Sequence, residues 1–176
     1  MKKINKPWMA VVMAALLLVT LVGVVWARPS DRPAAADITR KIALIPADFA
    51  PPNEDVDWFS NGHTVHCVSG SCVFEAPVVF PCLPAVTVER IRLHVLDDST
   101  GGWAAASLYK VRPAAGTNWL QGSASSPEGT SGGFKTYTSA DMNTVVWPAQ
   151  KAYVRLLIND SLVQVYGVTV EYHRNI

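Results

Sequence analysis

The sequence predicts an all-β fold, an antiparallel β-sandwich or jelly roll of about eight or nine strands, preceded by an N-terminal signal or anchor helix. After residue 41, apolar and polar residues alternate with a period of two, and β-branched and aromatic residues fill these segments. Turn signals rich in Gly, Pro, Ser and Asn separate them at short intervals. Because the 3.6-residue period of an amphipathic helix is missing there, a helical domain is excluded, and a β-barrel remains the alternative.

Residues 1–27 are predicted to be a signal peptide or an N-terminal membrane anchor. Three lysines in the first six residues precede an uncharged apolar run over residues 8–27, which ends in Val25-Trp26-Ala27. About 18 uncharged residues can span a bilayer, so cleavage and retention both stay open. Either outcome places the rest of the chain outside the cytoplasm, secreted or tethered to the outer face of the cytoplasmic membrane. Membrane contact is expected only through residues 8–27, if they are uncleaved.

Residues 28–41 are predicted to be a flexible Pro/Ala-rich tether, and residues 42–176 the β-sandwich domain. The tether, RPSDRPAAADITRK, has few large apolar side chains to offset the entropy of ordering. The whole chain carries 15 basic and 14 acidic residues; without the three lysines of the first 27 residues, 12 basic and 14 acidic residues remain, a net charge of −2. A nucleic-acid partner is excluded, because such a domain normally carries a basic surplus.

The first predicted strands, 63–68 and 71–80, flank Ser69-Gly70, a signal for a two-residue hairpin. A long strand follows at residues 86–96. Its apolar phase shifts by one residue at Glu89-Arg90, which predicts a β-bulge there.

The later strands are predicted from the same alternation, at residues 103–111, 118–123, 134–139, 152–158 and 162–172. Strand 134–139 is polar enough to lie at a sheet edge. The last two strands are expected to form a second hairpin around Asn159-Asp160-Ser161. The final strand changes phase at Gly167, and its many β-branched residues predict a central position in its sheet.

Several short motifs occur in an order that resembles a group of secreted, uncharacterised bacterial β-sandwich domains. They span about residues 42–172 and are Ile45-Pro46-Ala47-Asp48-Phe49-Ala50-Pro51, Trp58, Gly62, Ala76-Pro77-Val78-Val79-Phe80-Pro81, Ala85-Val86-Thr87-Val88, Asp97-Asp98-Ser99, Ser107-Leu108-Tyr109-Lys110-Val111 and Tyr166-Gly167-Val168-Thr169-Val170-Glu171-Tyr172. The resemblance implies export and an all-β fold. It carries no activity and no functional residue.

Cys67 and Cys72 are predicted to form a disulfide. With Ser69-Gly70 as the centre of a hairpin turn, the two residues face each other as a non-hydrogen-bonded pair, with a Cα separation of about 4.5 Å. Export to an oxidising compartment favours the bond. Cys82 is left unpaired or as an alternative partner for either cysteine.

A zinc site is the weaker alternative for the same region, since its ligand types follow the pattern H-x2-H-C-x4-C-x9-C at His63, His66, Cys67, Cys72 and Cys82. Along a strand, His63 and His66 face opposite sides, so the pattern does not converge without a bulge.

A calcium site at Asp97 and Asp98 is a second weak alternative, because hard carboxylate oxygens at a strand end suit that ion. We expect no cofactor and favour no metal.

The function classes that the sequence favours are non-catalytic. The chain has no H-E-x-x-H motif and no P-loop. The first hypothesis is an exported structural or protein-interaction module, with a protein partner or self-association at the cell surface or in the extracytoplasmic space. The alternative is a carbohydrate-binding module, in which Trp103, Trp119 or Trp147, each next to a turn or loop, stacks on a sugar ring. A small secreted hydrolase is the third hypothesis, and it requires a pocket in which a histidine and a carboxylate converge.

Overall fold

The structure is a computed structural model that describes residues 38–81, 85–129 and 132–174. The predicted signal or anchor segment, most of the tether and Cys82 lie outside the described residues. Among the described residues, no helix is long and apolar enough to cross a membrane.

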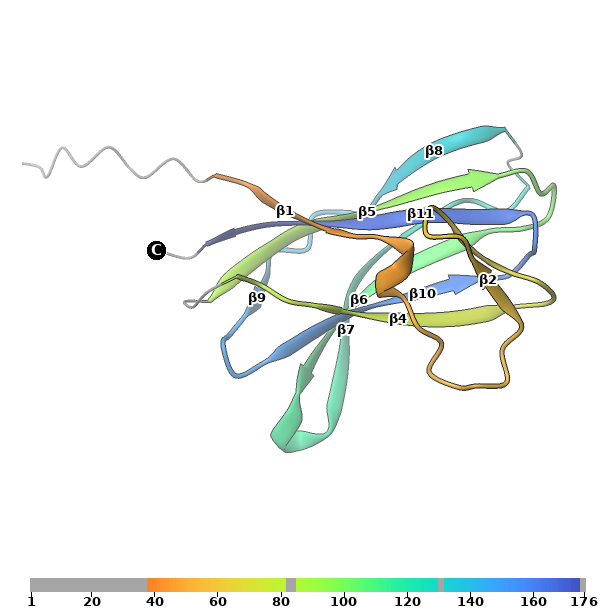
Figure 1. The fold of residues 1–176 in the computed structure, drawn as a ribbon. Coiled ribbons are helices and arrows are strands. Elements are labelled where there is room, and N and C mark those ends of the chain that lie inside the picture. The colour runs from red at the N-terminus through yellow and green to blue at the C-terminus, as the bar shows by residue number, and fades with distance from the viewer. Residues whose placement is uncertain (1–37, 82–84, 130–131, 175–176) are drawn as a thin grey trace, which may run out of the picture. The chain divides into compact units, whose positions relative to one another are not determined.

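The described residues form two antiparallel β-sheets (Figure 1). Sheet A contains β1 (Arg40–Leu44), β2 (Trp58–Ser60), β3 (Val65–Cys67), β5 (Val86–Asp97), β8 (Gly133–Thr138), β9 (Thr144–Val146) and β11 (Val163–Arg174). Sheet B contains β4 (Cys72–Val78), β6 (Ala104–Arg112), β7 (Thr117–Ser125) and β10 (Lys151–Ile158). Two short 3-10 turns, η1 (Pro46–Asp48) and η2 (Pro113–Ala115), complete the described elements. The predicted all-β sandwich class is confirmed.

The strand order in sheet A is β2-β3-β11-β5-β8, with β1 also paired to β11 and β9 also paired to β5. In sheet B the order is β4-β10-β6-β7. The last strand, β11, therefore has partners along both edges, which confirms its predicted central position. The polar strand β8 lies at an edge of sheet A, again as predicted.

The hydrophobic core lies between the two sheets, because alternate residues of each strand point inward. In β10 the inward residues are all buried, and they are Ala152, Val154, Leu156 and Ile158. Phe74 of β4 is fully buried and meets the Trp58 ring edge-on, with the ring centroids 5.5 Å apart.

Both predicted changes of phase are present as β-bulges between β5 and β11. The register skips Glu89 in β5 and Tyr166 in β11. The residue after the second bulge, Gly167, has φ +148°, and a Cβ placed there would lie 2.5 Å from the carbonyl oxygen of Leu44 in β1. A side chain at this position would collide with the backbone of the neighbouring strand.

Both predicted hairpins are wrong. The segment β3 pairs with β2 and β11 in sheet A, whereas β4 pairs with β10 in sheet B. Likewise β10 belongs to sheet B and β11 to sheet A. The short links that follow β3 and β10 therefore connect the two sheets at one end of the sandwich. A two-residue turn signal is compatible with either connection, and tertiary packing of the two apolar faces decides between them.

The predicted bond between Cys67 and Cys72 is present, with the two Cα atoms 5.8 Å apart. It joins β3 of sheet A to β4 of sheet B, so it is a link between sheets and not the cross-strand pair that the sequence suggests. Both residues are buried in the core.

We expect a Cys67→Ala/Cys72→Ala double variant to unfold with a free energy about 2 kcal/mol lower than the parent, because the bond closes a short loop in the unfolded chain. Urea unfolding of the oxidised parent, the reduced parent and the double variant measures this difference. The reducing agent should leave the double variant unchanged. Equal stability of oxidised and reduced parent would contradict the expectation.

Candidate functional site

The three candidate tryptophans do not form one group. Trp103 precedes β6 and is half-buried, with its backbone N–H bonded to the Asn159 side chain. Trp119 in β7 is 41% exposed, and Trp147 in the turn between β9 and β10 is 59% exposed. The strand register brings Trp119 and Trp147 to one end of the sandwich and leaves Trp103 at the other.

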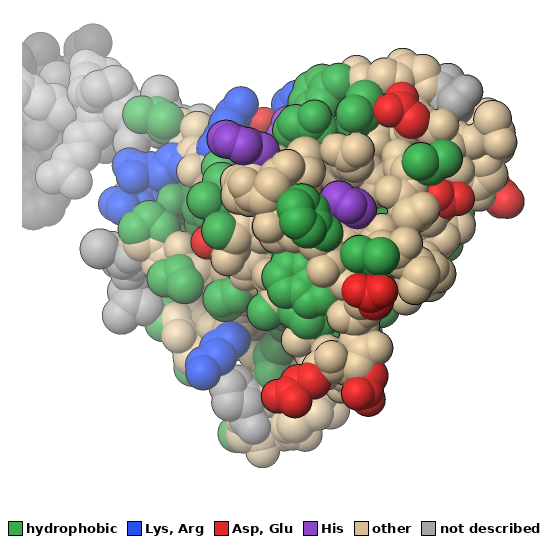
Figure 2. Space-filling model, turned by 45° about the vertical axis from the view of Figure 1, so that its right-hand side comes forward, with side chains coloured by type: hydrophobic (Ala, Val, Ile, Leu, Met, Phe, Trp, Pro, Cys, Tyr) green, Lys and Arg blue, Asp and Glu red, His purple; other side chains and the backbone are tan. Residues whose placement is uncertain are grey.

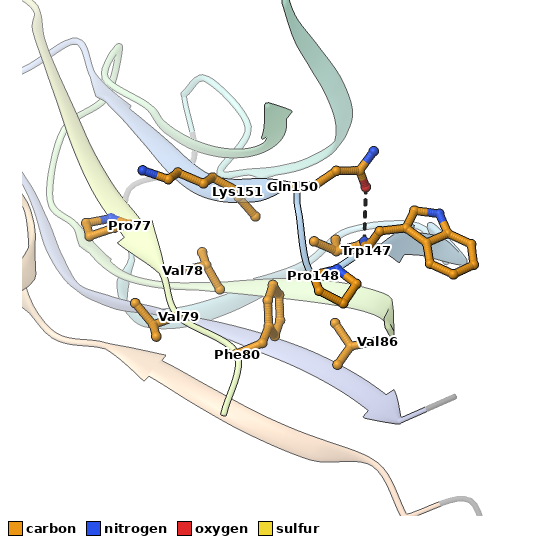
Figure 3. A pocket seen from close by; sticks show the side chains of 11 residues that line it. Pro77, Val78, Val79, Phe80, Val86, Trp147, Pro148, Gln150 and Lys151 are labelled. Atoms are coloured by element: carbon orange, nitrogen blue, oxygen red, sulfur yellow. Dashed lines mark hydrogen bonds between the residues drawn. The ribbon is translucent and has the colours of Figure 1, made fainter. Parts of the chain in front are cut away.

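An open cavity of about 420 Å³, which we call the end pocket, lies where β4 ends and β10 begins (Figure 3). Its floor is the buried end of the core, made of Val78, Val86, Val146 and Ala152. Its rim is formed by more exposed residues, which are Pro77, Val79, Phe80, Trp147, Pro148, Gln150 and Lys151. The wall is mostly apolar, with an amide and an ammonium group at its edge.

Figure 3 shows how the rim side chains are oriented. The Phe80 ring stands inside the pocket and faces Pro148, while the Lys151 side chain extends toward Pro77. The Trp147 indole points outward, away from Phe80. Phe80 is held by an edge-to-face contact with the buried ring of Tyr172, at a centroid distance of 5.2 Å.

The outward position of Trp147 is set by a tight turn. The backbone N–H of Gln150 donates to the Trp147 carbonyl at 2.8 Å, and the Gln150 side-chain oxygen accepts the Trp147 N–H at 3.0 Å. Pro148 occupies the second position of this turn, where its fixed φ is favourable. These two bonds hold the turn that carries the exposed indole above the pocket.

Lys110 connects the Trp119 and Trp147 regions. It is the register partner of Trp119 in the β6–β7 hairpin, and its ammonium donates to the carbonyl of Val145 at 3.2 Å, two residues before Trp147. The Arg112 guanidinium lies 6.0 Å from the centre of the Trp119 ring. We call Trp119, Trp147 and the end pocket together the tryptophan end.

The outer face of sheet B continues from the rim of the end pocket. Pro77 on the rim is the register partner of Tyr153, which in turn pairs with Tyr109. The two tyrosine rings are stacked, with centroids 5.2 Å apart and an angle of 8° between their planes. Arg155 lies 5.1 Å from the centre of the Tyr109 ring and donates two hydrogen bonds to Glu75, at 2.9 and 2.7 Å.

Charge and burial shift two of these groups. The hydrogen bond to Glu75 is the main reason that the pKa of Arg155 is raised, and burial is the main reason that the pKa of Tyr153 is raised. Both side chains therefore keep their usual protonation state, a cation beside a neutral phenol. The sequence analysis did not predict the end pocket or the stacking of Tyr109 on Tyr153. The alternation of inward and outward residues places both tyrosines on the outer face of their strands, but no local sequence signal shows that β6 and β10 are neighbours.

The zinc alternative is wrong for Cys67 and Cys72, since their sulfur atoms are bonded to each other. His63 is exposed, while His66 lies on the outer face with its ring 5.3 Å from that of Phe59. Cys82 lies outside the described residues. Within those that are described, no group of three His, Cys, Asp or Glu side chains is placed to hold a metal ion.

The structure does not bring the calcium candidates together. Asp97 is buried and accepts the backbone N–H of Ser99 through Oδ1, whereas Asp98, the first residue after β5, is exposed. Asp160, in the link between β10 and β11, accepts a hydrogen bond from the Ser99 hydroxyl at 3.0 Å. These bonds fix the turn after β5.

Within the described part of the chain, the residues that line the end pocket include neither a histidine nor a carboxylate, so they provide no hydrolytic acid–base pair. On the outer face of sheet A, both ring nitrogens of His94 lie within hydrogen-bond distance of threonine hydroxyls, those of Thr136 at 3.0 Å and Thr169 at 2.9 Å. Burial, and then the charge of Arg92, lower the pKa of His94, so this imidazole is neutral near pH 7.

No family model and no curated protein matches the chain. Solved structures with a similar arrangement include the C-terminal CBM6 of the laminarinase LamC from Zobellia galactanivorans, with 16% identity, a TM-score of 0.45, and coverage of 74% of this chain and 98% of that one. The xylan-binding module CBM15 has 13% identity, a TM-score of 0.47, and coverage of 79% and 100%. A module of Cellvibrio mixtus lichenase 5A, in complex with cellotriose, has 11% identity, a TM-score of 0.41, and coverage of 77% and 98%. The likeness to these structures is one of fold.

Proposed function

We propose that this chain is an exported, non-catalytic carbohydrate-binding module that binds a glycan at the tryptophan end. The observation that carries the proposal is Trp147, 59% exposed on the rim of an open pocket, together with Trp119, 41% exposed at the same end of the sandwich. Trp is highly buried on average, and exposed aromatic side chains that adjoin an apolar pocket favour a binding surface. Trp147 is held in this position by its own turn.

The chemistry of the site suits a sugar ring. The faces of Phe80 and the indoles offer apolar surfaces for the C–H face of a sugar, and the Gln150 amide and Lys151 ammonium offer polar groups for its hydroxyls. A pocket of about 420 Å³ lies in the range for small-ligand sites. Because the pocket is open and is continuous, through Pro77, with the stacked rings of Tyr153 and Tyr109, the site can accept part of a polysaccharide chain and not only a free monosaccharide.

We expect Trp147→Ala to weaken glycan binding about tenfold or more, and Trp119→Ala to weaken it less, because a few exposed aromatic anchors carry most of the energy of an interface. The measurement is native affinity electrophoresis of the full chain, in nonionic detergent, through gels containing soluble polysaccharides. Phe134→Ala is the matched control, since Phe134 is 58% exposed in β8, at the other end of the sandwich. The proposal fails if both tryptophan variants migrate like the parent in every gel that retards the parent, or if no gel retards it.

The structural or protein-interaction hypothesis keeps one specific observation in its favour. The outer face of sheet A exposes aromatic side chains, with Phe59 at 49%, Phe134 at 58% and Tyr166 at 39%. Phe134 and Tyr166 meet edge-to-face, with centroids 5.2 Å apart. The same variants separate the two functions, because binding of a protein at this face would be weakened by Phe134→Ala and not by Trp147→Ala.

A further inference from the structure

The charges of the described domain are separated along its long strands. At the end away from the pocket lie five acidic residues, Asp57, Asp97, Asp98, Glu128 and Asp160, with Lys135 as the nearby cation. The end of the pocket carries a surplus of basic residues. Figure 2 shows most of the Lys and Arg side chains on the left of that view and most of the Asp and Glu side chains on its right.

The cations fall into two groups according to their partners. Lys41, Arg90 and Arg92 all contact the buried carboxylate of Glu171, at 3.3, 3.5 and 2.9 Å. Burial raises the pKa of Glu171, but the hydrogen bonds from Arg92 and Lys41 outweigh that effect and lower it, so this carboxylate stays ionised and its charge is compensated. Arg155 is compensated in the same way by Glu75.

The second group lies at the end of the sandwich that carries the pocket and comprises Lys110, Arg112, Lys151 and Arg174, none of which has a carboxylate partner among the described residues. Lys151 lies on the rim, is exposed and forms no described ion pair. Lys110 donates to the carbonyl of Val145, next to a floor residue, and Arg174 donates to the carbonyl of Pro81, next to Phe80, at 3.4 Å. Arg112 lies against the Trp119 ring. A carbonyl or an aromatic ring leaves a cation's charge in place, so the pocket end of the domain carries uncompensated positive charges, one of them, that of Lys151, on the pocket rim.

The acidic groups at this end are already engaged. The Glu171 carboxylate contacts the three cations named above, and the Asp141 carboxylate lies 3.2 Å from the Arg90 guanidinium. Glu89 accepts one hydrogen bond from the Thr39 hydroxyl and lies 3.2 Å from the imidazole of His173. The described residues that line the pocket include no carboxylate.

From this arrangement we infer that the ligand of the tryptophan end is an acidic polysaccharide, whose uronic-acid carboxylates bind Lys151 and the cations around it while the sugar faces pack on the aromatic side chains. The inference rests on the proposed function and adds the chemical class of the glycan. A neutral glycan would leave these cations without a counter-charge, whereas a uronate supplies one at each acidic sugar.

The test compares each acidic polymer with its own neutral ester, so that the backbone stays constant and only the charge changes. Polygalacturonate, alginate and hyaluronan are used, each beside its esterified form, together with neutral xylan, β-glucan and mannan. We expect at least one acid form to bind, its ester to bind at least tenfold more weakly, and the acid form to lose affinity as salt rises from low to physiological concentration.

The matched variants are Lys151→Gln and Lys135→Gln, since both lysines are exposed but only Lys151 lies on the pocket. Lys151→Gln should weaken binding of the acid polymer about fivefold at low salt, and Lys135→Gln should leave it unchanged.

Binding of an ester or a neutral polymer as tight as that of the acids overturns this inference and leaves glycan binding intact. Retardation by none of the polymers overturns both proposals, and an equal effect of the two lysine variants shows long-range attraction without a site, which also overturns the inference.

Discussion

A Phe74→Ala variant should unfold with a free energy about 3–5 kcal/mol below that of the parent. The ring of Phe74 is fully buried between the sheets and rests edge-on against Trp58. Its removal loses the transfer free energy of the phenyl group and leaves a cavity, because β4 and β10 are held in register along seven residue pairs and cannot collapse freely. The expected loss is a large part of the stability of a typical domain.

Urea unfolding, followed by tryptophan fluorescence, measures this effect. Phe134→Ala is the control, since it removes an equal ring from an exposed position, and it should change stability by about 0.5 kcal/mol or less. Phe74→Leu, which restores most of the volume, should recover more than half of the loss. Equal effects of the buried and exposed substitutions would contradict the packing described for this core.

Gly167→Ala should cost about 3 kcal/mol, although it adds a single methyl group. Two causes act together. The backbone of Gly167 has φ +148°, which L side chains rarely adopt, and the new Cβ would lie 2.5 Å from the Leu44 carbonyl oxygen. That oxygen belongs to the backbone of β1, so relief requires β1 to move away from β11.

Gly101→Ala is the matched control, because a Cβ at Gly101 meets no atom within 4 Å and its φ lies outside the left-handed range. Its stability should stay within about 0.5 kcal/mol of the parent. Amide hydrogen exchange adds a local measurement, since in Gly167→Ala the amides of β1 should lose protection before those of β10. Unchanged protection of β1 would show that the close approach to Leu44 does not hold that strand.

The period-two pattern predicted the long strands well because each has one face in the core. The strands β5, β6, β10 and β11 lie within one or two residues of their predicted positions, and the skipped residues at Glu89 and Tyr166 appear where the apolar phase changes. A β-bulge is visible in the sequence for the same reason that it exists in the structure, since one extra residue is needed to return the apolar side chains to the inner face.

Pairing could not be predicted in the same way. The strands β1, β2 and β9 have three to five residues, too few for a periodic signal, and Arg40 and Lys41 of β1 read as part of a polar tether. The turn at Ser69-Gly70 carries a hairpin signal but joins the two sheets. Local signals describe the chain near a turn, whereas the choice of sheet depends on contacts with residues distant in the sequence.

The candidate site was partly accessible from the sequence. The exposure of Trp119 and Trp147 follows from their place beside turns, but Trp103 has the same surroundings and is half-buried. The pocket and its cations depend on the meeting of β4, β6, β10 and the end of β11, whose residues lie far apart in the chain.

The separation of charge gives the domain a permanent electric dipole, even though its net charge is small. Such a dipole turns the molecule in the field of a charged polymer before any contact forms, and the positive pole is the one that carries the pocket. Productive encounters should then outnumber those expected from random orientation, and this advantage should fade once added salt shortens the Debye length to about 8–10 Å. A near-neutral protein can in this way show an association rate that depends on ionic strength, with its orientation on approach set by where its charges lie and not by how many it has.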